Sequence, residues 1–296
     1  MRFPPAITKV GSRTSRAVRS GKTCHLPLAT CHSRSVSAFT LMEVAISLAV
    51  ISIALVAIIG VLPLGMNVQK ENREGTIVNQ DATIFLEAIS KGAQGVDHLT
   101  NYVYAITNYQ TRYLNGVPQS PTIVWGYNEN GSSSQPSQSL PSLPLINGYR
   151  IIGLLSTPEF TDDNGRPTNN LFSSGYSNHI TAYVRSISGA ASDKPPQDNS
   201  IIQDNAFAYR LLCVNAPVPV DTNVFNLTPA QQAYSKQLAA NLHELRLTFL
   251  WPIQPNGKVG TGRQTYRMLI AGQVLTNIVL GNHLYFYQSQ SFTNAP

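Results

Sequence analysis

A long apolar segment near the N-terminus constrains this chain more than any other feature. No charged residue occurs from Val44 to Met66. At about 1.5 Å of rise per helical residue the segment would be roughly 34 Å long, enough to cross a bilayer core of about 30 Å. One carboxylate, Glu43, lies at its N-terminal edge, where a lone acid is costly in lipid and calls for a partner. The pattern predicts one membrane-spanning helix.

The residues before this segment predict its orientation. Residues 1–38 contain no Asp or Glu but seven cations: Arg2, Lys9, Arg13, Arg16, Arg19, Lys22 and Arg34. Charges after the segment are mixed. The positive-inside bias therefore predicts a single-pass protein with residues 1–38 in the cytoplasm and the C-terminal domain on the other side of the membrane.

Small residues lie before the apolar segment rather than after it. Ser37 and Ala38 precede it, and no Ala-x-Ala pattern follows it, unlike in an ordinary secretory signal. Cleavage after Ala38 would leave the apolar helix on the mature chain and create a new α-amino group four residues from Glu43.

The run Phe39-Thr40-Leu41-Met42-Glu43-Val44, followed by the apolar segment, resembles the class III signal of type IV prepilins and pseudopilins. The resemblance implies that a prepilin peptidase cuts between Ala38 and Phe39 and methylates the amino group of Phe39. It also implies that Glu43 pairs with the N-terminus of a neighbouring subunit. The membrane would then be the bacterial inner membrane, with the C-terminal domain periplasmic or otherwise extracytoplasmic. The family usually has Gly before the cut, where this chain has Ala38. A signal-anchor helix on an unrelated membrane protein is the plainer alternative.

Removal of residues 1–38 would change the charge of the protein. The chain has 21 Lys and Arg against 15 Asp and Glu, and loss of the seven leader cations leaves 14 against 15. This weakens any argument for a general nucleic-acid-binding surface, although local basic patches stay open. Cys24 and Cys31 belong to the leader, so Cys213 alone remains and is expected to be a small buried hydrophobe.

The helix is expected to continue beyond the membrane. Within the span, which we take as residues 39–66, an assembly stripe is expected at Val50, Ile53, Val56 and Ile59. Pro63 should kink or locally melt the helix because it lacks a backbone donor. In residues 67–95 an amphipathic continuation is expected, with one apolar face formed by Val78, Ala82, Phe85 and Ile89 and with stop signals at Gly92 and Gly95.

Residues 96–296 alternate short β-like runs with Gly, Pro, Ser and Asn, which predicts one β-rich globular domain. The fold class is therefore α+β and pilin-like, a long N-terminal helix packed on an antiparallel sheet. The expected strands are Tyr102–Thr107, Thr122–Tyr127, Tyr149–Leu155, His179–Ile187, Ala206–Val214, Glu244–Trp251, Tyr266–Ala271, Thr276–Leu280 and Leu284–Tyr287. The strands at Glu244 and Tyr266 should form a hairpin, and Thr228 should cap a short helix over Ala230–Leu242.

A second resemblance covers the last third of the chain. Leu245–Phe249, Trp251-Pro252, Pro255-Asn256-Gly257 and Gly262–Arg267 are similar to the tail of prepilin-like proteins called Verru_Chthon cassette protein B, and Val61–Asn67 points the same way. That family implies a pseudopilin-like protein with no established chemistry.

No catalytic, cofactor or metal site is predicted. The histidines outside the leader are scattered, and nucleotide-binding and nucleophile motifs are absent from the sequence. Asp162-Asp163-Asn164-Gly165 is better explained as an Asx turn than as a calcium loop. Tyr102, Tyr104, Tyr109 and Tyr113 raise the alternative of a carbohydrate or nucleic-acid face, but half-buried strand residues explain them more simply.

Three classes of function remain. The first is a pilus or pseudopilus subunit whose partners are the prepilin peptidase, other pilin-like subunits, the inner-membrane assembly platform and the membrane. The second is a signal-anchored exoplasmic binding protein or enzyme without a filament role. The third is a minor or tip subunit whose globular domain binds a ligand, a secreted protein or DNA. No clear nucleic-acid or small-molecule ligand is indicated by the sequence.

Overall fold

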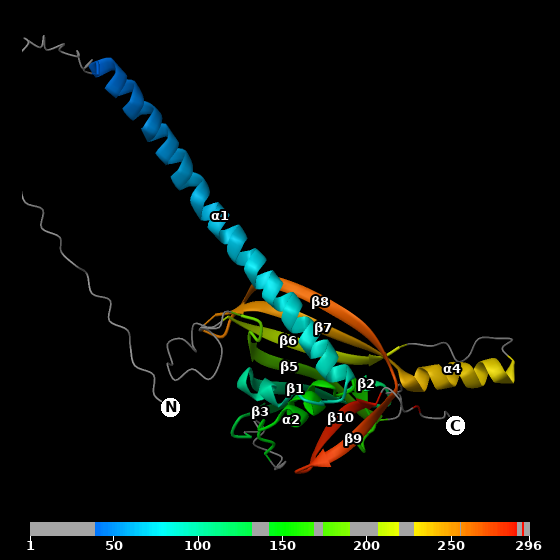
Figure 1. Cartoon of the computed structure of the whole chain (residues 1–296). Coiled ribbons are helices and arrows are strands. Elements are labelled where there is room, and N and C mark those ends of the chain that lie inside the picture. The colour runs from blue at the N-terminus through cyan, green and yellow to red at the C-terminus, as the bar shows by residue number, and fades with distance from the viewer. Residues whose placement is uncertain are drawn as a thin grey trace, which may run out of the picture. The chain divides into compact units, whose positions relative to one another are not determined.

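The computed structural model describes residues 39–131, 142–168, 174–189, 207–218, 228–254, 256–288 and 292 (Figure 1). The expected leader, with Ala38, lies outside these residues. The chain divides into two compact units, Met1–Gly60 and Val61–Pro296. The first contains the N-terminal part of helix α1, and the second contains the rest of α1 and the β-rich domain.

Helix α1 runs unbroken from Leu41 to Ser90. The expectation that Pro63 locally melts the helix is wrong, because the helical conformation persists on both sides of it. Pro63 lacks only one backbone donor, and the helical turns on either side of it continue the helix.

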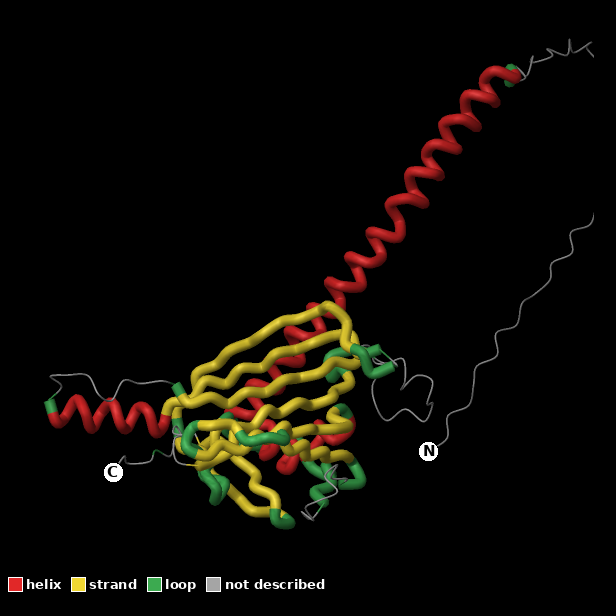
Figure 2. The backbone as a smooth tube through the Cα atoms, turned by 180° about the vertical axis from the view of Figure 1, so that it is seen from behind, coloured by secondary structure: helices red, strands yellow, loops and turns green. Residues whose placement is uncertain are grey.

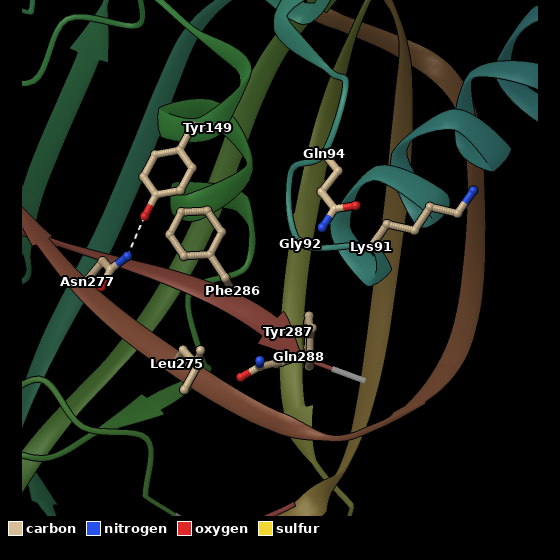
Figure 3. A pocket seen from close by; sticks show the side chains of 9 residues that line it. All are labelled: Lys91, Gly92, Gln94, Tyr149, Leu275, Asn277, Phe286, Tyr287 and Gln288. Atoms are coloured by element: carbon tan, nitrogen blue, oxygen red, sulfur yellow. Dashed lines mark hydrogen bonds between the residues drawn. The ribbon is translucent and has the colours of Figure 1, made fainter. Parts of the chain in front are cut away.

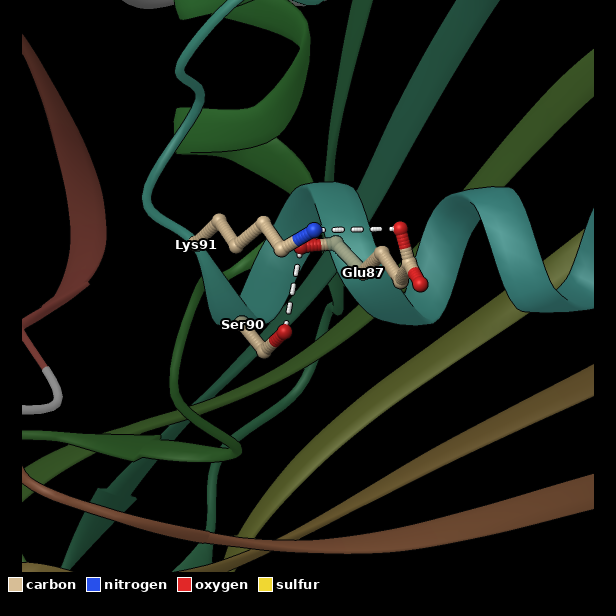
Figure 4. Close-up of polar contacts among 3 residues, drawn as sticks. All are labelled: Glu87, Ser90 and Lys91. Carbon is tan, nitrogen blue, oxygen red and sulfur yellow. Dashed lines mark hydrogen bonds and ion pairs between the residues drawn. The ribbon is translucent and has the colours of Figure 1, made fainter.

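The C-terminal end of α1 is defined by local chemistry. Gly92 adopts a φ of 71°, a left-handed conformation that favours glycine at a helix end. In the last turn, Lys91 Nζ pairs with Glu87 Oε2 at 3.1 Å, and Ser90 Oγ donates to the Glu87 carbonyl at 3.0 Å (Figure 4). The stop predicted at Gly92 is confirmed.

An antiparallel sheet dominates the second unit (Figure 2). Its main path runs in the order β2-β1-β5-β6-β7-β8, and β3 pairs with β1 while β4 pairs with β5. A hairpin of β9 and β10 forms a second small sheet. The bounds are β1 Val103–Leu114, β2 Val117–Pro118, β3 Ile123–Asn128, β4 Phe160–Thr161, β5 Ser174–Arg185, β6 Ala208–Pro217, β7 Leu242–Ile253, β8 Val259–Ala271, β9 Gln273–Val279 and β10 Asn282–Gln288.

The core of this unit lies between one face of the sheet and the Val61–Ser90 part of α1. Val78, Ala82, Phe85 and Ile89 are buried there, so the predicted apolar face of the helix is confirmed. The sheet side is contributed by alternate strand residues, which all point to one face because successive side chains of a strand alternate. They include Ile180, Ala182, Val184, Tyr209, Leu211, Cys213, Leu245, Leu247 and Phe249. We call this the inner face and the opposite side the outer face.

Most of the predicted elements outside α1 are confirmed. β7 and β8 pair antiparallel along nearly their whole length, as expected of the hairpin. Helix α4, Pro229–Asn241, begins with a capping box between Thr228 and Gln231, and Leu242 belongs to the following strand. A short 3-10 helix, Asp97–Asn101, follows α1.

The prediction of a strand over Tyr149–Leu155 is wrong, because these residues form helix α2, Gly148–Leu155. The side chain of Asn147 accepts a hydrogen bond from the Arg150 backbone N–H at 3.0 Å and so caps the helix. Gly148 starts the helix where a Cβ atom would lie 2.3 Å from the Val96 carbonyl oxygen. The periodicity of a short apolar run does not distinguish a strand from a buried helix. Here the Asn147 cap favours the helix.

Candidate functional site

The start of α1 is held by a reciprocal cap. The Thr40 backbone N–H donates to Glu43 Oε2 at 3.2 Å, and the Glu43 backbone N–H donates to Thr40 Oγ1 at 3.3 Å. This arrangement satisfies two of the donors that a helix start otherwise leaves free. Phe39, directly before it, is 81% exposed. Glu43 is therefore a cap of its own helix in the isolated chain, a role that the resemblance to prepilins did not suggest.

The first part of α1 is apolar on every side. The four residues of the expected assembly stripe, Val50, Ile53, Val56 and Ile59, are exposed in the single chain. Neighbouring large apolar residues of the same segment are exposed as well: Ile46, Leu48, Ile51, Leu55 and Ile58. Pro63 is exposed as well. Within the described residues, one helix is long and apolar enough to cross a membrane, judged by length and composition alone, and that helix is α1. The apolar surface thus surrounds this part of the helix instead of forming a single stripe.

Asp81 joins α1 to the sheet, and sequence reasoning missed it. Its carboxylate is fully buried and accepts three hydrogen bonds. They come from the Ile187 backbone N–H at 2.9 Å, the Ser188 backbone N–H at 2.8 Å and the Tyr209 hydroxyl at 2.8 Å. A buried carboxylate is tolerated when donors surround it in this way. Asp81 therefore connects the helix to the end of β5 and to β6.

The environment of Tyr209 follows from this contact. Burial, the negative charge of Asp81 and their hydrogen bond all raise the pKa of the Tyr209 hydroxyl well above its usual value. The phenol stays protonated and donates to the carboxylate. The only sequence signal for this pair is an acid at position 81, next to the apolar position 82.

A second contact from α1 reaches the edge of the sheet. Asn79 Oδ1 accepts hydrogen bonds from the side chains of Gln264 and Tyr266 on β8. Together with Asp81 it fixes the helix to three strands or strand ends, which makes this part of α1 a component of the domain core.

A polar cleft of about 230 Å³ is lined mainly by residues of β1, β3, β5 and β10. Its walls carry amides and aromatic rings joined by hydrogen bonds. Trp125 Nε1 donates to Gln110 Oε1 at 3.1 Å, and Gln110 Nε2 donates to Asn178 Oδ1 at 3.1 Å. Two buried atoms have no hydrogen-bond partner within the described residues, Asn108 Oδ1 and His283 Nδ1. The cleft is therefore a pre-formed polar site with free hydrogen-bonding capacity.

A larger pocket, of about 530 Å³, lies beside the end of α1 (Figure 3). The rings of Tyr149 and Phe286 stack at 4.2 Å between centroids, and the Tyr149 hydroxyl accepts a hydrogen bond from Asn277. Lys91 and Gln94 lie on the other side of the pocket (Figure 3). The stacked rings fix its shape, but it gathers no set of catalytic groups.

The other candidates from the sequence have structural roles. Asp162 Oδ1 accepts hydrogen bonds from the backbone N–H groups of Asn164 and Arg166, which confirms the Asx turn. Cys213 is buried, as expected, and burial raises the pKa of its thiol. In the part of the chain that the structure describes, no group of three or more His, Cys, Asp or Glu side chains is placed to hold a metal ion.

Comparison with known proteins adds no relative. No family model matches the chain, no curated protein matches it, and no solved structure matches it. Its own residues form a capped, apolar N-terminal helix whose second part is built into an antiparallel β-sheet domain.

Proposed function

We propose that this chain is a pilin-like subunit, a pseudopilin or minor pilin, of a type IV pilus or a type II secretion-like filament. The single observation that carries the proposal is the position of Phe39-Thr40-Leu41-Met42-Glu43 at the start of one continuous helix, α1. Prepilin peptidase removes residues 1–38 and methylates Phe39, and the N-terminal helix anchors the protein in the inner membrane. The globular domain lies on the extracytoplasmic side.

The two parts of α1 support this proposal in different ways. Its N-terminal part exposes apolar side chains in all directions, so it has surface for lipid and for several neighbouring helices. Its C-terminal part supplies Phe85 and Asp81 to the core of the domain. A subunit that assembles through its helix needs both features, because force on the helix must reach the domain.

Glu43 supplies the polar contact of assembly in this proposal. Cleavage after Ala38 creates an α-ammonium group at Phe39, and methylation leaves its charge in place. A neighbouring subunit's ammonium group offers the Glu43 carboxylate an opposite charge at nearly the same membrane depth, and this pair sets the axial register between subunits.

Mass spectrometry of the protein from native membranes tests the proposal. The expected chain begins at N-methylated Phe39. An intact Met1 terminus, or a cut after Met66, would overturn it. An Ala38→Gly variant serves as the control for cleavage, because glycine is the residue that the prepilin pattern usually has there.

The polar cleft favours a second candidate, a membrane-anchored binding protein with no filament role. Free hydrogen-bonding atoms at Asn108 and His283 are suited to a polar ligand. Processing at Phe39 together with crosslinking between subunits distinguishes the filament subunit from this alternative.

A further inference from the structure

The outer face of the sheet carries a row of arginine and tyrosine side chains. In the strand register Arg263 on β8 is opposite Leu250, Leu250 is opposite Arg210 on β6, and Arg210 is opposite Tyr183 on β5. These residues therefore lie in one line across four strands. Figure 2 views the sheet from this side, with the Val61–Ser90 part of α1 behind the strands.

Two more residues extend the row toward β1. The guanidinium of Arg185 lies over the ring of Tyr104, at 5.2 Å from its centroid. The rings of Tyr104 and Tyr183 are 6.1 Å apart and tilted by 44°. We call the five residues Arg263, Arg210, Tyr183, Arg185 and Tyr104 the arginine–tyrosine strip. Since neighbouring strands are about 4.8 Å apart, the strip is roughly 19 Å long from β8 to β1.

The arginines of the strip lack acidic partners. Within the described residues, the ion pairs of the outer face join Arg246 to Glu159 at 3.7 Å and Arg267 to Glu244 at 3.7 Å. None joins Arg185, Arg210 or Arg263 to a carboxylate in that part of the chain. Arg210 Nε is buried and makes no hydrogen bond to any described residue. The strip therefore holds three positive charges that no described carboxylate neutralises.

The tyrosines distinguish this surface from a simple basic patch. Tyr104 is 37% exposed, and Tyr183 is half-buried beside it. Ring faces next to guanidinium groups are suited to planar, aromatic ligand groups that alternate with negative charges. An acidic peptide or polysaccharide would use the arginines but would leave the paired rings without a matching group.

We propose that the arginine–tyrosine strip binds single-stranded nucleic acid. The guanidinium groups of Arg210 and Arg263 contact phosphates, which arginine recognises with two parallel hydrogen bonds. The rings of Tyr183 and Tyr104 stack on bases. Every base has a flat face, so the site has little sequence preference. This proposal does not depend on filament assembly.

Fluorescence anisotropy of a labelled oligothymidylate with the detergent-solubilised full chain tests the arginines. Residues 1–38 carry seven cations of their own, so all variants keep the same leader. Arg210→Gln combined with Arg263→Gln is compared with Lys236→Gln combined with Lys258→Gln, which removes the same charge elsewhere. Loss of two phosphate contacts should reduce the slope of log affinity against log salt by about 1.4, while the lysine control keeps the wild-type slope. Equal slopes in the two double variants overturn the proposal.

Tyr183→Leu tests the bases separately from the charge. Loss of one stacked base should weaken oligothymidylate binding about 5-fold or more, with an unchanged salt slope and unchanged binding of heparin, which has no bases. Equal weakening for both ligands, or for neither, means that the surface is a general polyanion site or no site at all.

Photocrosslinking of an oligonucleotide containing 5-iodouracil gives the location independently of these affinities. Crosslinked peptides should contain Tyr104 or Tyr183. Crosslinks confined to residues 1–38 would show that the leader alone binds the oligonucleotide, and the proposal would then be wrong.

Discussion

At the scale of single residues, Asp81 shows what local sequence cannot predict. Its three donors come from positions more than a hundred residues away, and two of them are backbone groups that carry no sequence signal. The adjacent apolar positions could be predicted because they repeat at helical spacing along one segment. A partner that arrives from another part of the fold leaves no such periodicity.

Substitution of Asp81 by Asn should destabilise the domain by about 3 kcal/mol. The amide has one acceptor oxygen for three donors, so buried donors lose their partner. Tyr209→Phe removes one donor and leaves the carboxylate two others, so a smaller loss of about 1 kcal/mol is expected. Urea unfolding of the purified chain measures both, with the exposed Glu87→Gln as control. A wild-type midpoint for Asp81→Asn would contradict the role assigned to this carboxylate.

His243 should make the stability of the domain depend on pH. Burial lowers the pKa of His243 from 6.5 to about 4, so in the folded state its imidazole stays neutral. Between these values the unfolded chain binds a proton that the folded chain does not, and stability therefore falls as the pH drops from 6.5 towards 4. The shift corresponds to a loss of about 3 kcal/mol at the lower end.

Denaturant unfolding at pH 7 and at pH 4.5 checks this dependence. His243→Phe is the matched variant, because a phenyl ring keeps the edge-on packing against Tyr287, whose ring centroid lies 5.6 Å away. Its free energy of unfolding should therefore fall less than that of wild type between pH 7 and pH 4.5. If wild type and variant lose the same stability on acidification, His243 does not contribute.

At the scale of elements, the features that could be predicted are those whose signals are local. The apolar face of α1, the cap at Thr228 and the β7–β8 hairpin each depend on spacing or end residues within a short segment. Helix α2 could not be predicted, because eight residues hold too few turns for a clear helical period and its cap residue, Asn147, also suits a turn. The separation of β9–β10 from the main sheet depends on packing, which strand patterns do not report.

Phe85→Asp tests whether α1 belongs to the core of the domain. Phe85 is fully buried, so the variant loses the packing of a core aromatic and places an unpaired charge in apolar surroundings. A loss of about 4 kcal/mol or more is expected. Thr83→Asp, at an exposed position of the same helix, should change the stability by less than about 0.5 kcal/mol. Thermal unfolding, monitored by circular dichroism, compares the Phe85→Asp and Thr83→Asp variants. Equal midpoints would show that the helix is not part of the core.

At the scale of the whole molecule, the net charge does not reveal a local basic surface on the sheet. Without residues 1–38 the chain has 14 cations and 15 acids, a balance that weakens the case for a general polyanion-binding surface and leaves local basic patches open. Strand register gathers Arg210 and Arg263 on one face of the sheet, although 53 positions separate them in the sequence. By contrast, a helix long and apolar enough to cross a membrane could be predicted, because that property depends only on length and composition.

Assembly of the whole molecule should depend on the charge of Glu43 and not only on its cap. Glu43→Ala removes both the carboxylate and the hydrogen bonds with Thr40, whereas Glu43→Gln keeps an acceptor for the capping box and removes the charge. If a neighbouring ammonium group at Phe39 is the partner, both variants should insert into the membrane, be processed, and fail to assemble. Crosslinking of tagged and untagged subunits in native membranes, with the N-terminus checked by mass spectrometry, measures assembly and processing of each variant.

Wild-type assembly of Glu43→Gln together with failure of Glu43→Ala would assign Glu43 to helix capping and remove charge pairing from the mechanism. Wild-type assembly of both variants would leave the register between subunits to the apolar surface around Val50 and Val56.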